Sequence, residues 1–249
     1  MLSAQNMTLT PSKSCLCLTL CLLMLSLSSI SAWADEADES WLPEQLHLHA
    51  FGSLGASYHD AKDLGYRRNL EQKNTVQANQ LGFSSDSLVG AQADWFLNDE
   101  VATNLQLVSR NNADGNWKPE VITTFIKYKP SESLQLRVGR IPTASNIGAE
   151  TRYASYAYTQ IRPTPAIYGL LSAYDRYDGI DAEYTMPIAT GIGKVIVNYG
   201  KTVGEYYISG NSGHIKDVSN YGIVTSWQKD NLDLRALYLL HHTNNQNSN

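Results

Sequence analysis

The sequence lacks the residues that define several common classes of exported protein. Its three cysteines, Cys15, Cys17 and Cys21, all lie near the N-terminus. A chain cleaved after residue 34 therefore has neither a disulfide framework nor a thiolate metal site. There is no zinc-ligand spacing and no glycine-rich loop that leads into a helix, so we expect no cofactor. Lysine and arginine number 19 against 24 acidic residues, a mildly acidic balance that predicts no nucleic-acid partner.

Long apolar runs are also missing beyond residue 34, which argues against a helical membrane protein. The one apolar stretch, Cys15 to Ile30, follows Lys13 and leads into Ala32-Trp-Ala34. This pattern predicts a secretory signal peptide over residues 1–34, with a retained N-terminal anchor as the alternative. Residues 35–45 read as a polar lead-in on the periplasmic side.

No convincing amphipathic helix follows residue 45, and period-two alternation dominates instead. Segments of roughly 9–11 residues alternate apolar and polar side chains, which is the length that a tilted transmembrane strand needs. We expect nine strands. They cover residues 46–58, 80–96, 101–110, 121–129 and 134–140, and then 179–186, 194–200, 221–228 and 232–240.

The connections between these segments alternate in length. Residues 59–79, 141–177 and 201–217 form long loops and 111–119 an intermediate one, whereas 97–100, 130–133, 187–193 and 229–231 form short turns. Outer-membrane barrels have short periplasmic turns and long external loops. The pattern therefore favours a transmembrane antiparallel β-barrel over the alternative, a secreted all-β sandwich, which has no reason to gather its long loops at one end.

The two faces of the expected strands suit lipid on the outside and water on the inside. One face carries Leu, Val, Ile and Ala in mid-strand, and the other carries Gln, Asn, Lys, Arg, Asp and Glu. Aromatic residues at the strand ends predict the two girdles of a membrane barrel. The predicted girdle residues are Trp95, Tyr128 and Trp227 near the short turns, and Tyr58, Tyr199, Tyr221 and Tyr238 near the long loops.

Several stretches together resemble one known family, the outer-membrane porins of Gram-negative bacteria, and are most similar to porin-like proteins of gammaproteobacteria. Among these stretches are Phe51-Gly-Ser-Leu-Gly-Ala-Ser-Tyr58, Leu136-Arg-Val-Gly-Arg140 and Tyr177-Asp-Gly-Ile180. The resemblance implies an outer-membrane location and a homotrimer, with lipopolysaccharide and the barrel assembly machinery as partners. It also implies that the long insertion, 141–177, folds into the barrel and narrows it.

Two features depart from that family. Nine strands is an odd number, whereas bacterial single-chain barrels have an even one. The chain also ends in an Asn-rich tail rather than on an aromatic residue. We therefore expect residues 46–249 to be a C-terminally truncated part of a larger barrel of about 16 strands.

The function predicted from these patterns is passive diffusion of small hydrophilic solutes through a water-filled channel. Opposed rows of charge across a constriction select solutes by size and charge, and Arg137→Glu is expected to lower a preference for anions. The alternative role for each of these charges is an ion pair that pins the loop to the wall. The predicted pore-lining residues are Lys127, Lys129, Arg137, Arg140, Arg152, Arg162, Asp175, Asp178, Asp181 and Glu183.

Other functions are predicted less well by the sequence. His47 and His49 share a strand face and His241 and His242 are adjacent, but neither pair has a third ligand that would make a metal site. No arrangement of nucleophile, base and orienting group can be read from the sequence, so we expect no enzymatic activity. The alternatives to a channel are a non-conducting surface or adhesion barrel and a non-functional porin fragment.

Overall fold

The structure, a computed structural model, describes residues 43–144, 148–149, 151–154, 169, 171–215 and 218–243. The predicted signal peptide and most of the lead-in lie outside the described residues, as do parts of the 141–177 insertion, including Arg162. None of the helical segments in the described part of the chain has the length and hydrophobicity needed to span a bilayer.

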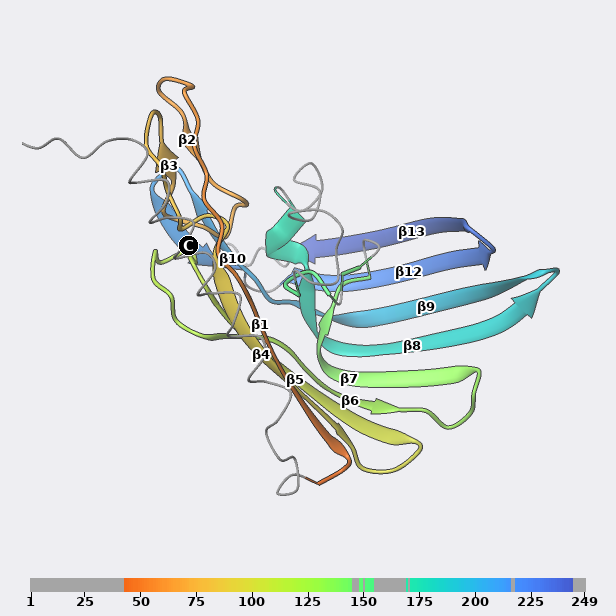
Figure 1. The fold of residues 1–249 in the computed structure, drawn as a ribbon. Coiled ribbons are helices and arrows are strands. Elements are labelled where there is room, and N and C mark those ends of the chain that lie inside the picture. The colour runs from red at the N-terminus through yellow and green to blue at the C-terminus, as the bar shows by residue number, and fades with distance from the viewer. Residues whose placement is uncertain are drawn as a thin grey trace, which may run out of the picture. The chain divides into compact units, whose positions relative to one another are not determined.

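Nine strands form one antiparallel sheet in which each strand pairs with the next one along the chain (Figure 1). The sheet is strongly curved, with β1, β4 and β5 turned away from the plane of β8, β9, β12 and β13 (Figure 1). The predicted all-β class and the predicted number of strands, nine in one antiparallel sheet, are confirmed. The strands are β1 (Leu46–Ser53), β4 (Leu88–Phe96), β5 (Val101–Arg110), β6 (Glu120–Tyr128), β7 (Leu134–Pro142), β8 (Arg176–Ile188), β9 (Gly191–Thr202), β12 (Val218–Lys229) and β13 (Leu232–Thr243).

The sequence prediction placed most strand centres correctly and erred at the ends. Strand β1 stops at Ser53 and β4 starts only at Leu88, so the first long connection runs from residue 54 to residue 87. This connection contains the two-residue strands β2 (Gly65–Tyr66) and β3 (Val76–Gln77). The connection after β9 contains a second hairpin, β10 (Glu205–Ile208) and β11 (Asn211–His214). A short 3-10 helix, η4 (Ser172–Tyr174), closes the insertion.

A row of glycines lets side chains lie flat on the concave face of the sheet. Gly139, Gly179 and Gly200 are paired in register across β7, β8 and β9. A Cβ at Gly200 would lie 2.7 Å from the ring of Tyr177. Tyr177 instead passes over this row, and its hydroxyl donates to Asp181 Oδ2 at 2.9 Å. The glycine row therefore leaves the room that Tyr177 needs to reach Asp181.

The long connections are held together by hydrogen bonds at one end of the sheet. The backbone N–H of Leu70, in the 54–87 loop, donates to Gly169 O of the insertion at 3.2 Å, and Leu70 O accepts from Tyr207 N of β10 at 2.8 Å. At the base of the insertion, Thr143 N donates to Asp175 O at 2.6 Å. The loop, the insertion and the β10–β11 hairpin thus form one layer beyond the strand ends.

Candidate functional site

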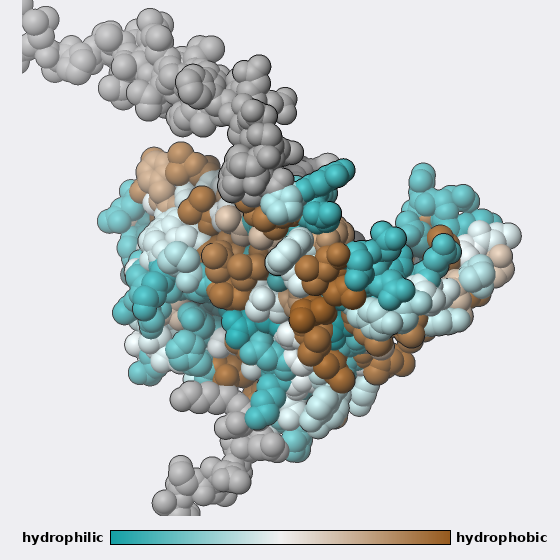
Figure 2. Space-filling view, turned by 90° about the horizontal axis from the view of Figure 1, so that it is seen from below, coloured by the Kyte–Doolittle hydropathy of each residue, from teal (hydrophilic) through white to brown (hydrophobic). Residues whose placement is uncertain are grey.

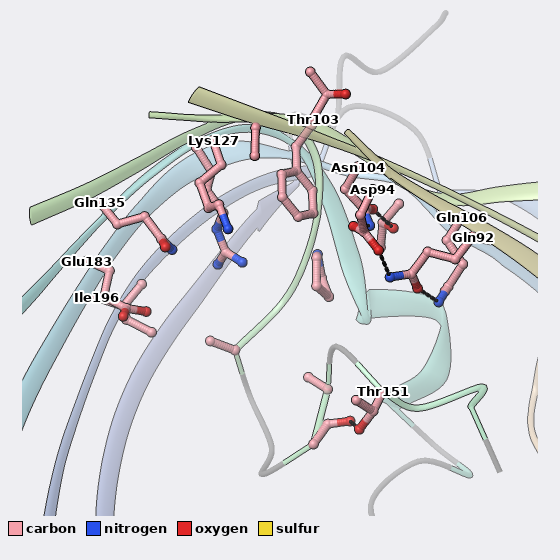
Figure 3. Close-up of a pocket in the computed structure, with 18 of the residues that line it drawn as sticks. Gln92, Asp94, Thr103, Asn104, Gln106, Lys127, Gln135, Thr151, Glu183 and Ile196 are labelled. Carbon is pink, nitrogen blue, oxygen red and sulfur yellow. Dashed lines mark hydrogen bonds between the residues drawn. The ribbon is translucent and has the colours of Figure 1, made fainter. Parts of the chain in front are cut away.

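A hollow lies on the concave face of the sheet, between the strands and the insertion (Figure 3). Its volume is about 630 Å³. The strands supply long polar side chains to it, whereas the insertion supplies small ones. The sheet residues that line it include Gln92, Asp94, Phe96, Asn104, Gln106, Thr123, Phe125, Lys127, Gln135, Arg137, Glu183, Lys194, Ile196 and Arg235, and the insertion adds Ala144, Gly148, Ala149, Thr151 and Ala154.

One part of the wall is a network of amides around a carboxylate. Asp94 accepts hydrogen bonds from Gln92 Nε2 at 2.6 Å and from Asn104 Nδ2 at 2.7 Å. Gln106 Nε2 donates to Gln92 Oε1 at 2.9 Å, and Thr123 Oγ1 donates to Asn104 Oδ1 at 2.5 Å. Figure 3 shows Gln92, Asp94, Asn104 and Gln106 side by side on neighbouring strands. Period-two alternation places such residues on one face, and the network then fixes their orientations.

Arg137 and Asp181 form a bidentate ion pair in the adjoining part of the wall. The Nε–Oδ1 distance is 3.0 Å and the NH2–Oδ2 distance is 2.7 Å, and the two residues face each other across β7 and β8. The Arg137 guanidinium also lies 5.4 Å from the ring centroid of Phe125. Only 5% of the surface of each ion-paired residue is exposed. Both residues predicted from the sequence to line the pore are on the concave face, but their charges compensate each other.

The remaining charges of the wall lie on β6, β8, β9 and β13. Lys194 Nζ and Glu183 Oε1 are 2.8 Å apart. Lys127 Nζ lies 5.8 Å from the ring centroid of Phe96. Arg235 reaches the same hollow from β13. These side chains are less buried than Arg137.

A second charge cluster, built around a fully buried carboxylate, holds the loops together. The Glu71 carboxylate, in the 54–87 loop, is 0% exposed and lies 3.1 Å from Arg110 NH2 of β5. It is also 3.5 Å from Arg152 of the insertion and 3.5 Å from Arg176 of β8. Burial raises the pKa of Glu71, but the three guanidinium groups more than offset this effect, so its pKa is held below its ordinary value.

Other residues complete this cluster, which we call the Glu71 cluster. Glu120 lies 3.2 Å from Arg110 and 3.8 Å from Arg176. Asp175 pairs with Arg152, and it also lies 3.2 Å from Arg176. The predicted pore-lining residues Arg152 and Asp175 therefore belong to a cluster that fixes the insertion to the wall, and neither lines the hollow.

The structure corrects the placement of two predicted residues. Arg140 and Asp178 pair across β7 and β8 on the same face as Val138 and Ile180, opposite to Arg137. Residues three apart in a strand lie on opposite faces, so Arg137 and Arg140 cannot both point inward. Arg140 instead forms a bidentate ion pair with Asp178, at 2.8 and 3.0 Å, on the outer face.

The other predicted charges have different outcomes. Lys127 and Glu183 line the hollow, while Lys129 is exposed one residue beyond the end of β6. Arg162 is outside the described residues. In the part of the chain that the structure describes, no group of three or more His, Cys, Asp or Glu residues could hold a metal ion.

The predicted girdle residues that lie in strands share the convex face. Trp95, Tyr128 and Trp227 lie near the short turns. Near the other end, the rings of Tyr199 and Tyr221 are in tilted contact, with 5.2 Å between their centroids. Tyr238 pairs with Ile223 in the middle of β13, away from either strand end. Tyr58 lies outside the sheet, where its hydroxyl donates to Asn79 Oδ1 at 3.2 Å.

Several charged residues that line the hollow were not among those predicted from the sequence. Asp94, Lys194 and Arg235 were on the polar side of their strands, so period two alone could have identified them. Glu71 had no comparable signal, because it lies in an aperiodic polar loop and its arginine partners are 39 to 105 residues away.

Comparison with known proteins finds similarity only among solved structures. No family model matches the sequence, and no curated protein matches it. The loop L8 deletion mutant of OmpT, an outer membrane protein of Vibrio cholerae, is similar at 17% identity and a TM-score of 0.33, over 81% of this chain and 72% of that one. The in-vitro folded trimer form of OmpT is similar at 14% identity and a TM-score of 0.34, over 81% of this chain and 68% of that one. Both solved structures are of outer membrane proteins.

The comparison also corrects the expectation that the chain has no enzymatic activity. The similar structures are outer membrane proteins, and outer-membrane barrels include hydrolases as well as channels. A barrel fold does not exclude catalysis, since function depends on the site that the fold carries. The predicted absence of enzymatic activity therefore does not follow from this fold.

Proposed function

We propose that this sheet forms part of the wall of an outer-membrane channel for passive diffusion of small hydrophilic solutes. The observation that carries the proposal is the opposite character of the two faces of one sheet. Lipid on one side and water on the other would satisfy both faces. A soluble protein would have to cover the apolar face with another layer.

The convex face exposes large apolar side chains across all nine strands. Val89 is 57% exposed, Ile180 54% and Leu234 54%. Figure 2 shows hydrophobic side chains gathered in patches on the side of the molecule seen from below. Transfer of one such side chain out of water is worth about 1.5–3 kcal/mol. The face as a whole therefore favours contact with hydrocarbon strongly.

The concave face suits a water path for the converse reason. Its hollow is lined by carboxylates, amides, lysines and arginines, and the insertion occupies its other side (Figure 3). Charged groups are costly in a dry interior unless they are paired. Several of these groups are only half-buried, which is consistent with water between the wall and the insertion.

Closure of the sheet sets a condition on the complete barrel. In the described sheet, strands β1 and β13 each have one neighbour, and they run in the same direction because they are the first and the last of nine strands that alternate in direction. Open strand edges are not tolerated in lipid. Antiparallel closure therefore needs an odd number of further strands between β13 and β1, which agrees with the even totals of bacterial barrels.

The proposed assembly, a homotrimer, is supported by the resemblance of the sequence to outer-membrane porins. A homotrimer in the outer membrane, surrounded by lipopolysaccharide and inserted by the barrel assembly machinery, would place the convex face against lipid and neighbouring copies. Chemical cross-linking of membranes that contain the protein should give a trimer band, and a ladder that ends at the monomer would contradict the trimer.

Planar-bilayer conductance tests the channel directly. Folded protein in detergent should produce discrete, ohmic current steps, whereas detergent alone and heat-unfolded protein should produce none. Heat-modifiable gel mobility reports in parallel whether a folded barrel is present. Heat-modifiable protein without current steps would overturn the channel and favour a non-conducting surface barrel.

A further inference from the structure

The charges that line the hollow are unevenly paired. Among the described residues, four basic side chains line it, against two acidic ones, Asp94 and Glu183. Arg137 is neutralised by Asp181 and Lys194 by Glu183, at 2.7 and 2.8 Å. The two cations that remain are Lys127 and Arg235.

No described residue forms an ion pair with Lys127 or Arg235. Lys127 lies over the ring of Phe96, a contact that leaves its charge uncompensated. Arg235 is half-buried, and its Nε has no hydrogen-bond partner among the described residues. The one remaining anion, Asp94, shares its charge with two amide donors, from Gln92 and Asn104.

The insertion adds no described charge to the other side of the hollow. Its described lining residues are Pro142, Ala144, Gly148, Ala149, Thr151 and Ala154. Arg152 and Asp175 turn instead to the Glu71 cluster. Two opposed rows of charge, as expected from the sequence, are therefore not formed by the described residues. As far as the described residues are concerned, the field in the hollow comes from the wall.

We infer that the solute path is selective for small anions and that Lys127 and Arg235 are the residues that determine this selectivity. The inference rests on the proposed channel function and names the class of solute that the channel favours. In the described lining of the hollow, two uncompensated cations face one carboxylate that is hydrogen-bonded to amides, so this lining carries a net positive charge. Solutes that carry carboxylate or other single negative charges gain from this field, and cations lose.

The test is the reversal potential of single channels in a tenfold KCl gradient, measured with the full chain. The unmodified protein should favour chloride over potassium. Each charge removed should change the permeability ratio by about twofold, the effect of one charge about 8 Å from an ion in water. Lys127→Gln with Arg235→Gln should therefore lower the ratio about fourfold, and Lys127→Glu with Arg235→Glu should reverse the preference.

Arg140→Gln is the matched control, because it removes one positive charge from the opposite face. It should leave the reversal potential unchanged. Heat-modifiable mobility identifies any variant that fails to fold, and Lys127→Gln and Arg235→Gln can each be measured singly in that case. A cation preference in the unmodified protein, or the same shift from Arg140→Gln, overturns the anion assignment and leaves the channel intact. Absence of current from folded protein overturns the channel and this inference together.

Discussion

Replacement of Glu71 by glutamine tests whether charge holds the loops against the wall. The carboxylate is 0% exposed and lies within 3.5 Å of Arg110, Arg152 and Arg176. Removal of one partner from a buried ion pair costs about 3–5 kcal/mol. Glu120 and Asp175 still compensate part of the positive charge. We therefore expect Glu71→Gln to lose about 3 kcal/mol, the lower end of this range.

The same carboxylate should make the stability of the loops depend on pH. The pKa of Glu71 is lower in the folded state than in the unfolded state. The carboxylate therefore stabilises the folded state fully at pH values above its unfolded-state pKa, which is about 4.3. This contribution is lost as the pH falls through the lower, folded-state pKa. Glu71→Gln should remove that pH dependence and leave the variant less stable at neutral pH.

Limited proteolysis measures this loss where it should occur. Trypsin can cleave the 54–87 loop after Arg67, Arg68 and Lys73 once the loop opens. When opening is fast, the cleavage rate follows the open population. A loss of about 3 kcal/mol then corresponds to cleavage about 100-fold faster. Glu132→Gln, an exposed change in a short turn, should cleave like the unmodified protein. Equal rates for Glu71→Gln and the control would refute the role of the Glu71 cluster.

Two further changes probe how the concave face is built. Tyr177→Phe removes the hydroxyl that donates to Asp181 and should lower the free energy of unfolding by about 1 kcal/mol. The gel-mobility shift should then occur at a lower temperature, and an unchanged temperature would count against a stabilising role of this hydrogen bond. Gly200→Val places methyl groups against the Tyr177 ring and should cost about 1–3 kcal/mol by overpacking. Ala236→Val, on the exposed outer face of β13, is its control, and equal gel-shift temperatures for these two variants would show that the glycine row is not needed.

Alternation made most of the sheet predictable from the sequence. β5 was predicted with its observed ends, Val101 and Arg110, because both turns that bound it are short or polar. β1 and β4 were predicted too long, since residues such as Tyr58 and Leu81 continue the apolar pattern beyond the strands. There the loop pairs with itself, through Ser57 and Gly82, and an isolated bridge leaves no signature that differs from a strand.

The charged residues were harder to assign, because a strand pattern gives the face of a side chain but not its partner. Lys127, Arg137 and Glu183 were placed on the polar face, yet only contacts show that Arg137 is neutralised and Lys127 is not. The prediction that Arg140 points inward was wrong, because its register, three residues from Arg137, puts it on the outer face. Arg152 lies in a loop, where no periodicity applies.

Pairing therefore decides which charges a solute in the hollow would meet. An ion pair such as Arg137 with Asp181 has almost no field beyond its own length, so its main effect is on the rigidity of the wall. The charges of the Glu71 cluster are likewise paired with one another, and these ion pairs hold the insertion in place. If solutes respond to charge in this hollow, they respond to the unpaired residues. Arg137→Glu would then act chiefly through damage to folding, because it places two carboxylates side by side at a buried position, whereas Lys127→Glu would change selectivity in a barrel that remains intact.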